Sequence, residues 1–322
     1  MSKSVLTIAT GKDVYIRMAV NLARSFFYWH RDDQIQFAIA TDQPRLIPPD
    51  LIDKITTIPI KPGEFGQGFS PKLYLDKLAL TEQTLFIDSD CLITANLNFI
   101  FNKFQGNPVS VVGGFISEGE WFGNVKKLCK KFGFQKIPKF NGGLYYLEKG
   151  SLSNQVYEKA RELESQYDEL GLIRLRNRPN DELLMSISMA YFGLTPIPDD
   201  GTIMSDPQAC PGPYDLKVSK GLSFLINPPP PDPKHQSWYP FYKVSPTIVH
   251  FLGHHTHEPV YKREAFSLDL YSRKKIPPSI ADGISQILIF YPEVILLSFK
   301  NWARPFYRIL FGVRRVKQSD RI

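Results

Sequence analysis

The residues best suited to chemistry are two aspartates, Asp88 and Asp90, which follow the apolar run 85–87. Side chains two apart at the end of a strand point the same way, and open α/β sheets bind ligands at the carboxyl ends of their strands. Paired carboxylates suit a hard divalent ion such as Mg²⁺ or Mn²⁺, which in turn neutralises a diphosphate. An acidic turn without a ligand is the alternative interpretation of the same residues.

A histidine at the end of a later apolar run, His250 in the segment IVHFLG, is the third candidate metal ligand. Imidazole nitrogen is a borderline ligand, so its presence favours Mn²⁺ over Mg²⁺. A histidine at a strand end can equally be structural. The neighbouring His254, His255 and His257 have neither a cysteine partner nor the HExxH spacing, so we expect no dedicated zinc site there.

A third motif, Phe140-Asn141-Gly142-Gly143, has the composition of a sugar site. Its glycines let the backbone approach a ligand closely, and the Asn141 amide both donates and accepts hydrogen bonds, as sugar hydroxyls require. Taken alone, these four residues are a turn.

The elements that must position these residues alternate between apolar strands and amphipathic helices. Hydrophobic periodicity predicts strands at 5–10, 36–40, 55–60, 85–87 and 109–112, and helices at 15–29, 72–80, 156–167 and 183–194. Such alternation is typical of an α/β fold. Prolines crowd the segment 196–246, which we expect to be loop or lid rather than a second core.

The length and composition describe an ordinary globular protein. The chain has 322 residues, of which 43% are hydrophobic and 22% charged, and these proportions exclude a wholly disordered chain. Three scattered cysteines form no disulfide framework, which suggests a reducing compartment. The sequence has neither the GxxxxGK[ST] run of a P-loop kinase nor the GxSxG elbow of a serine hydrolase.

The net charge of +7 is concentrated at the C-terminus. From residue 299 onward one acid, Asp320, accompanies seven bases: Lys300, Arg304, Arg308, Arg314, Arg315, Lys317 and Arg321. Aromatic and aliphatic residues separate these bases, as in segments that bind anionic membrane surfaces, whereas the bases of a nucleic-acid protein usually spread over a groove. We therefore expect a membrane-surface segment, with a C-terminal helix packed on the core as the alternative, and no nucleic-acid partner.

No segment is expected to span a bilayer. The apolar stretch 284–299 contains Pro292 and Glu293 and falls short of the ~20 apolar residues that a spanning helix needs. The N-terminus has no apolar region of signal-peptide length. A cytoplasmic protein, peripheral on the inner face of a membrane, is the expected location.

Five motifs in order resemble the GT-A glycosyltransferases, most closely glycosyltransferase family eight. They are ATGKDVY, KLYLDKLAL leading into LFIDSD, FNGGLYYL, PNDELLM and VHFLG, and the resemblance covers about residues 4–260. It implies a nucleotide-diphospho-sugar transferase fold with a mixed central sheet flanked by helices. Residues 1–275 would be the catalytic domain, with a donor-binding half at about 1–115 and an acceptor-side half at about 116–275. Residues 276–322 would be a basic amphipathic membrane-associating segment.

The resemblance also implies roles for individual residues. Asp88, Asp90 and His250 would hold Mn²⁺, with Mg²⁺ as the alternative, and Asn180, Asp181 and Glu182 match the catalytic polar cluster beside the anomeric carbon. The nucleotide sugar would lie against Ala9, Thr10, Asp13, Tyr15, Lys72, Ser89, Asn141, Gly142, Gly253 and His257.

Two positions depart from the family pattern. His257 stands near the place where the family often has a lysine that grips the phosphates, so donor binding would become more sensitive to pH. Asp181 stands where the family often has glutamine, and the sugar specificity therefore stays open.

The implied function is metal-dependent, retaining transfer of a hexose from UDP-galactose or UDP-glucose to a glycan or lipid-linked acceptor. An inverting enzyme would instead need a carboxylate base on the opposite face of the sugar, and the sequence leaves both stereochemical outcomes open. The alternative is a non-catalytic membrane-surface or polyanion-binding protein on an α/β scaffold.

Overall fold

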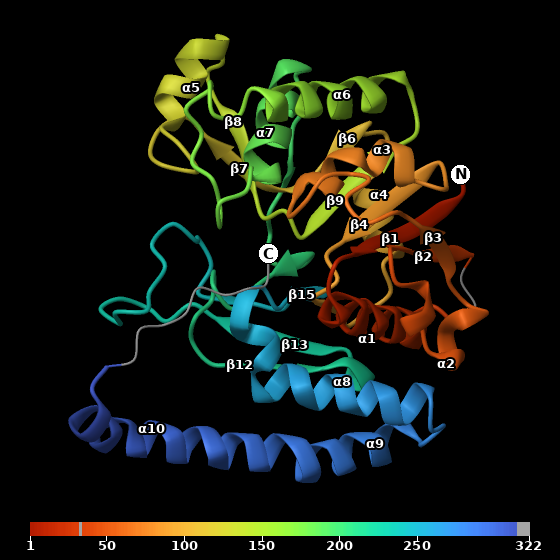
Figure 1. Cartoon of the computed structure of the whole chain (residues 1–322), viewed down its shortest axis with the longest axis vertical. Coiled ribbons are helices and arrows are strands. Elements are labelled where there is room, and N and C mark those ends of the chain that lie inside the picture. Colours follow the sequence, from red (N-terminus) through yellow and green to blue (C-terminus); the bar gives the residue numbers. More distant parts are fainter. Residues whose placement is uncertain (32–33, 314–322) are drawn as a thin grey trace.

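The structure is a computed structural model that describes residues 1–31 and 34–313. A six-stranded sheet forms its centre (Figure 1). In sheet order its strands are β3 Thr56–Pro59, β2 Ile35–Thr41, β1 Lys3–Ala9, β4 Gln83–Ile87, β9 Leu144–Glu148 and β6 Val109–Ser110. The first four run parallel, whereas β9 is antiparallel to both β4 and β6. The predicted mixed sheet is therefore confirmed.

Helices cover both faces of this sheet because its strands are apolar on both sides. Val5 of β1 packs in one hydrophobic cluster with α1 (Asp13–Trp29) and α4 (Asn98–Phe104). The next residue, Leu6, packs in a second cluster with α6 (Ser151–Ser165) and α7 (Asp181–Tyr191). Alternate side chains of a strand point to opposite faces, so β1 has a hydrophobic layer on each side.

Three smaller sheets extend the fold. One contains β7 Val112–Ile116, β8 Ile137–Phe140 and β10 Ile197–Pro198; another contains β5 Cys91–Ile93, β11 Met204–Ser205 and β15 Ile248–His250; the last contains β12 Tyr214–Lys217, β13 Leu222–Ile226 and β14 Lys243–Val244. The other short helices are α2 Pro49–Ile52, α3 Leu75–Leu78 and α5 Val125–Phe132. The predicted helix 72–80 is a 3-10 turn, Ser70–Tyr74, followed by α3.

The prediction that 196–246 lacks a core needs correction. Leu216, Leu225 and Val244 of β12, β13 and β14 are buried in a third hydrophobic cluster, together with Leu268 of α8 (Pro259–Ser272). These strands have two to five residues each, so their alternation is too short to stand out among the prolines of the sequence.

The prediction that no segment is long enough to span a bilayer also needs correction. Helix α9 (Pro278–Ser285), a π-helical turn (Gln286–Phe290) and α10 (Tyr291–Phe311) join end to end in one 34-residue helix along the edge of the molecule (Figure 1). We call it the C-terminal helix. By length and composition it is long and apolar enough to cross a membrane, since its polar residues do not interrupt it. The predicted bases Arg314, Arg315, Lys317 and Arg321 lie outside the described residues.

Candidate functional site

Asp88 and Asp90 lie in the tight turn that joins β4 to β5. Two backbone hydrogen bonds fix this turn: the Asp88 N–H donates to the Gly143 carbonyl at 2.9 Å, and the Phe251 N–H donates to the Asp90 carbonyl at 2.9 Å. The glycine motif and the histidine motif of the sequence therefore flank the two carboxylates.

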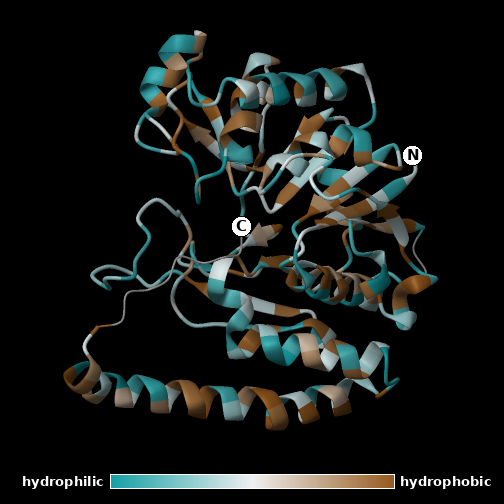
Figure 2. Ribbon diagram, viewed as in Figure 1, coloured by the Kyte–Doolittle hydropathy of each residue, from teal (hydrophilic) through white to brown (hydrophobic). Residues whose placement is uncertain are grey.

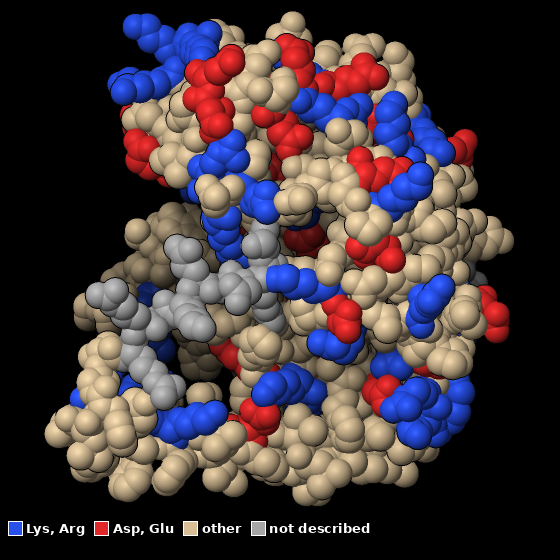
Figure 3. All heavy atoms as spheres, viewed as in Figure 1, with Lys and Arg blue, Asp and Glu red and all other residues tan. Residues whose placement is uncertain are grey.

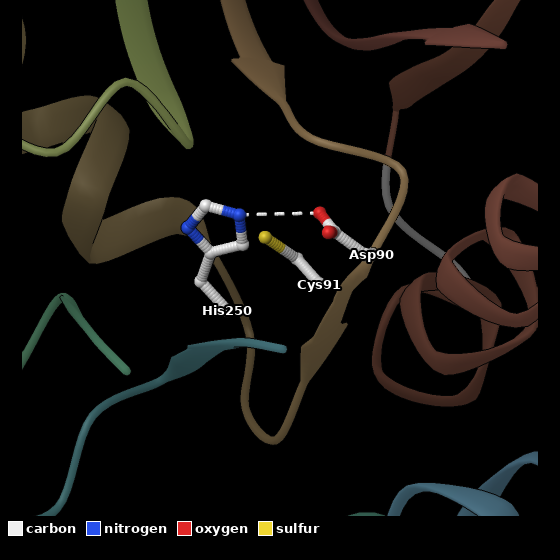
Figure 4. A group of neighbouring side chains, drawn as sticks. All are labelled: Asp90, Cys91 and His250. Atoms are coloured by element: carbon white, nitrogen blue, oxygen red, sulfur yellow. Dashed lines mark ion pairs between the residues drawn. The ribbon is translucent and has the colours of Figure 1, made fainter. Parts of the chain in front are cut away.

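His250 reaches the carboxylates because β15 pairs antiparallel with β5, which places it opposite Cys91. Its Nε2 lies 3.1 Å from Asp90 Oδ1 (Figure 4). The same nitrogen lies 3.7 Å from Asp88 Oδ2. The structure thus brings together the three side chains that the sequence marked as metal ligands.

Asn141 fixes which ring nitrogen of His250 faces the carboxylates. Its Nδ2 donates to the Asp206 carboxylate at 2.9 Å, and its Oδ1 accepts from the Gly143 N–H at 2.8 Å. The same Oδ1 lies 2.9 Å from His250 Nδ1, so Nδ1 must carry a proton and donate. Nε2 is then the nitrogen available to a metal.

The histidine is charged without a metal. Burial favours the neutral ring, but the charge of Asp90 and its hydrogen bond, reinforced by Asp88, raise the pKa of His250 to about 9. A divalent ion with positive charge in the same place would compete with the proton on Nε2.

Cys91 joins this group, and the sequence analysis did not single it out. Its Sγ lies with the ligand atoms of Asp90 and His250, all within 4.8 Å of one another (Figure 4). Burial, followed by the charges of Asp90 and Asp88, raises the pKa of Cys91 well above its ordinary value, so the thiol is protonated in the absence of a metal ion. The remaining donors are carboxylates and an imidazole, a set that fits Mn²⁺.

Asp88, Asp90 and His250 together are called the metal-ligand group below, as candidate ligands. Lys72 connects this group with the polar N-terminus of α7. Its Nζ lies 2.7 Å from Asp88 Oδ2 and 3.7 Å from Asp181 Oδ2, and it donates to the Gly142 carbonyl at 2.8 Å. Burial opposes its charge, but the carboxylates of Asp181 and Asp88 outweigh that cost and raise the pKa of Lys72. A fixed cation therefore lies between the two acidic groups.

The three polar residues at the start of α7 have different partners. The Asn180 side chain caps the helix by accepting the Leu183 N–H at 3.0 Å. Asp181 accepts the hydroxyl of Tyr145 at 2.6 Å, a contact that the sequence gave no signal for. Glu182 accepts the Gly142 N–H at 2.8 Å, and burial followed by the charge of Asp181 raises the pKa of Glu182 to about 7.

The two glycines allow these groups to approach closely. A Cβ on Gly143 would lie 2.5 Å from His250 Nδ1, and a Cβ on Gly142 would lie 2.9 Å from Glu182 Cγ. The pair therefore allows the His250 ring and the N-terminus of α7 to pack against one turn of backbone.

The residues expected around the nucleotide lie at the same edge of the sheet. β1 and β4 are parallel neighbours, so Ala9 and Thr10 leave the sheet where Asp88 does. Asp13 begins α1, and Tyr15 is half-buried in it. The carboxylate of Asp42, which the sequence analysis did not select, holds the loop by accepting the Gly11 N–H at 3.1 Å.

The other predicted donor residues lie on the two segments that carry Asp88, Asp90 and His250. Ser89 is buried between the two aspartates. Gly253 and His257 bound the 3-10 turn Gly253–His257 that follows β15.

Arg176 is a candidate that the sequence analysis missed. It lies in the loop between α6 and α7, and its Nη2 is 3.8 Å from the position that a Cβ on Gly253 would occupy. Arg176 and Asn177 both have positive φ, 50° and 63°, so the loop turns sharply there. In Figure 3 this face of the molecule is hollowed, with acidic side chains in its depth and Lys and Arg side chains at its rim.

No protein family model and no curated protein matches the sequence. Among solved structures, the chain is similar to the galactosyltransferase LgtC in complex with donor and acceptor sugar analogs, with 14% identity over 78% of this chain and 87% of that one and a TM-score of 0.49. It is also similar to glycosyltransferase GlyE of Streptococcus pneumoniae TIGR4, with 14% identity, 88% and 62% coverage and a TM-score of 0.47.

A third similar structure is the bifunctional glycosyltransferase WbbM, with 12% identity, 79% of this chain and 46% of that one covered, and a TM-score of 0.48. All three proteins are glycosyltransferases, the class that the sequence motifs resemble. At these sequence identities the similarity concerns the path of the chain and not the side chains of the site.

Proposed function

We propose that this chain is a metal-dependent glycosyltransferase that moves a hexose from a UDP-sugar to a glycan or lipid-linked acceptor. The observation that carries the proposal is the convergence of Asp88, Asp90 and His250, in which Nε2 of the imidazole faces both carboxylates at 3.1 and 3.7 Å. These three side chains would hold Mn²⁺, with Mg²⁺ as the second choice. The bound ion supplies Lewis-acid neutralisation of the departing diphosphate.

Lys72 is placed to support the same charge. Its ammonium is fixed by Asp88, Asp181 and the Gly142 carbonyl, so it needs little reorganisation when negative charge develops beside it. We assign it to the leaving diphosphate.

Asp181 and Glu182 are the carboxylates proposed to face the donor sugar. Tyr145 holds Asp181, and the Gly142 N–H holds Glu182, so both are oriented before substrate arrives. The charge of Asp181, and that of Glu182 once it has lost its proton, would stabilise positive charge at the anomeric carbon. In the retaining route the acceptor hydroxyl attacks from the face that the diphosphate leaves, and a leaving-group oxygen takes its proton.

Asn180 and Asn141 act through other residues. Asn180 caps α7 and thereby fixes Asp181, whereas Asn141 fixes the ring of His250. The remaining proposed contacts, to uridine, diphosphate or sugar, are Ala9, Thr10, Asp13, Tyr15, Ser89, Gly142, Gly253 and His257.

The charge of the candidate site favours this proposal over the alternative of a non-catalytic polyanion-binding protein. The described site contains more acidic than basic side chains: Asp88, Asp90, Asp181, Glu182 and Asp206 against Lys72 and His250. Such a site repels a polyanion but attracts a divalent ion, which can then accept a diphosphate.

We further propose that residues 1–275 form the catalytic domain, with a donor-binding half at about 1–115 and an acceptor-side half at about 116–275. It would work on the cytoplasmic face of a membrane with which the segment 276–322 associates. A lipid-linked acceptor would be presented at that surface.

The test is metal-dependent nucleotide binding by two variants. Asp88→Ala and Asp90→Ala should each abolish Mn²⁺-dependent UDP binding in calorimetry and transfer from UDP-galactose or UDP-glucose. Asp200→Ala is the matched control, because Asp200 pairs with Lys103 at the exposed surface. Parent-like binding of UDP and Mn²⁺ by both site variants would refute the assignment, and circular dichroism would show that they are folded.

A further inference from the structure

The first half of the C-terminal helix packs on the body of the protein through polar side chains, together with the buried Ala281 and the half-buried Phe290. Asp282 accepts hydrogen bonds from Ser219 and from Ser267, the latter at 2.7 Å. Further along, Lys262 of α8 forms an ion pair with Glu293 at 2.7 Å. These contacts hold the first half of the helix beside α8, as Figure 1 shows.

The opposite side of the helix is apolar and exposed. More than half of the large hydrophobic side chains that are exposed in the described chain belong to residues 280–313. Ile295 is 68% exposed, Trp302 66% and Ile309 81%. Figure 2 shows hydrophobic residues recurring along the whole helix at the edge of the molecule.

Helical spacing places the bases of α10 and its most exposed apolar residues on different sides, although the exposed Leu297 and Phe311 share the side of the bases. Lys300, Arg304 and Arg308 recur at the spacing that places them on the side of Glu293, which faces α8. Ile295, Trp302 and Ile309 fall on the far side. A helix of a soluble protein buries its apolar side. Helix α10 has no buried residue and leaves its apolar side exposed.

We propose that the C-terminal helix lies in the plane of an anionic bilayer surface, with its apolar side at the boundary of headgroups and acyl chains. The inference rests on the proposed membrane location and adds how the protein is held there. Lys300, Arg304 and Arg308 would reach lipid phosphates from the other side of the helix, and Trp302 suits the interface.

A spanning orientation fits the contacts less well. It would require the helix to leave α8, breaking the Lys262–Glu293 ion pair and the hydrogen bonds of Asp282. It would also draw Lys300 and Arg304 toward the hydrocarbon, where charged side chains are costly. In the plane of the surface, all of these groups keep their partners or stay in water.

A second copy of the chain is also a poorer occupant than lipid. No acidic residue lies between 294 and 313, so a second copy of this helix offers no opposite charge to Lys300, Arg304 and Arg308. An anionic surface supplies the opposite charge.

The experiment measures binding of the full chain to phospholipid vesicles, neutral or containing 30% anionic lipid. The variant Ile295→Glu/Ile309→Glu changes two exposed residues of the far side, and Ile173→Glu/Leu222→Glu makes the same change at exposed positions elsewhere. We expect the first pair to lower binding to anionic vesicles by at least about tenfold and the second pair to leave it unchanged. Binding should weaken in high salt, and lipids brominated near the headgroup should quench tryptophan fluorescence.

Three outcomes would overturn the inference. The far-side pair could bind vesicles like the parent; the parent could resist extraction by alkaline carbonate, as a spanning helix does; or the parent could be a lipid-free dimer that the far-side pair converts to monomer. Mn²⁺-dependent UDP binding is measured on the same samples. If the parent shows no Mn²⁺-dependent UDP binding, the proposed function is refuted. If the far-side pair binds UDP and vesicles as the parent does, the helix inference alone is refuted.

Discussion

At the scale of single residues, the metal-ligand group is oriented by a chain of hydrogen bonds that begins outside it. Asp206 Oδ1 accepts two backbone N–H groups, from Gln208 and Ala209, at 2.8 Å each. Its Oδ2 accepts from Asn141, whose oxygen in turn accepts from His250. Asp206 is therefore a positioning residue for the imidazole.

Asp206→Asn should disturb His250 without changing side-chain size. The backbone N–H groups of Gln208 and Ala209 need an acceptor, so the amide oxygen of the new asparagine would take the place of Oδ1. Its NH₂ group would then take the place of Oδ2 and face the NH₂ group of Asn141. Two donors repel, and the Asn141 amide must turn away from its present hydrogen bonds. We expect Mn²⁺ affinity, measured by the electron paramagnetic resonance signal of free Mn²⁺, to fall about 10- to 100-fold.

The control for this prediction is Asp199→Asn, which changes a nearby carboxylate that holds the Gly201 N–H instead. Equal Mn²⁺ affinity in the Asp206 variant and the parent would show that Asn141 keeps its orientation by other means. The ¹⁵N shifts of His250 report separately whether Nδ1 still carries its proton.

The sequence could predict which candidate ligands come together, but not the side chains that support them. Asp88, Asp90 and His250 stand at strand ends in recognisable motifs, so residue type and position suffice to select them. Tyr145 is an ordinary aromatic of an apolar strand until α7 places Asp181 against its hydroxyl. Such partners depend on contacts between distant segments, which no local pattern encodes.

At the scale of helices and strands, the pairing of β15 with β5 makes the site. It joins residues more than 150 positions apart and sets His250 opposite Cys91. A shift of one residue would turn the imidazole to the other face of the sheet. The parallel strands of the first 115 residues were predictable because burial on both faces makes them continuously apolar. The short strands of 196–246 were not.

A buried ion cluster ties the N-terminal half of the fold to α8. The Arg24 guanidinium of α1 contacts Asp50 of α2 at 3.0 Å and Asp269 of α8 at 2.9 Å. Arg24→Met would leave the buried Asp50 carboxylate without its cation, whereas Asp269 keeps Arg273, so we expect the free energy of unfolding to fall by about 3 kcal/mol in urea titrations. Arg174→Met, whose partner Asp168 is exposed, should have little effect. Equal stability of both variants would contradict the prediction.

The same cluster predicts a loss of stability in acid. Burial opposes ionisation of Asp50, but hydrogen bonds from Arg24 and Ser272 outweigh it and lower the pKa of Asp50. A lowered pKa means that the folded state binds the proton less tightly than the unfolded state, so the stabilisation is complete above about pH 4 and is lost as the pH falls further. Urea titrations at pH 5, 4 and 3 should show a shallower decline for Asp50→Asn. Parallel declines would exclude this role.

At the scale of the whole molecule, the proposed donor site is completed by segments that lie far apart in the sequence. The segment after His250 lacks the lysine that the resemblance leads one to expect, and the sequence analysis offered His257 in its place. The structure adds Arg176, which comes from the loop before α7 and ends beside Gly253. Because Gly253 is three residues past His250, a diphosphate on the metal would lie near this guanidinium.

Arg176→Gln should therefore weaken binding of the diphosphate and not of the nucleoside. One charge-assisted hydrogen bond is worth roughly 1.5 kcal/mol, or about tenfold in affinity, so the Kd for UDP with Mn²⁺ should rise about tenfold while the Kd for uridine stays the same. Arg174→Gln is the matched control, because Asp168 already holds that guanidinium. Calorimetry with both ligands separates the possibilities: unchanged UDP affinity would remove Arg176 from the site, and an equal loss for uridine would mean that it shapes the loop instead.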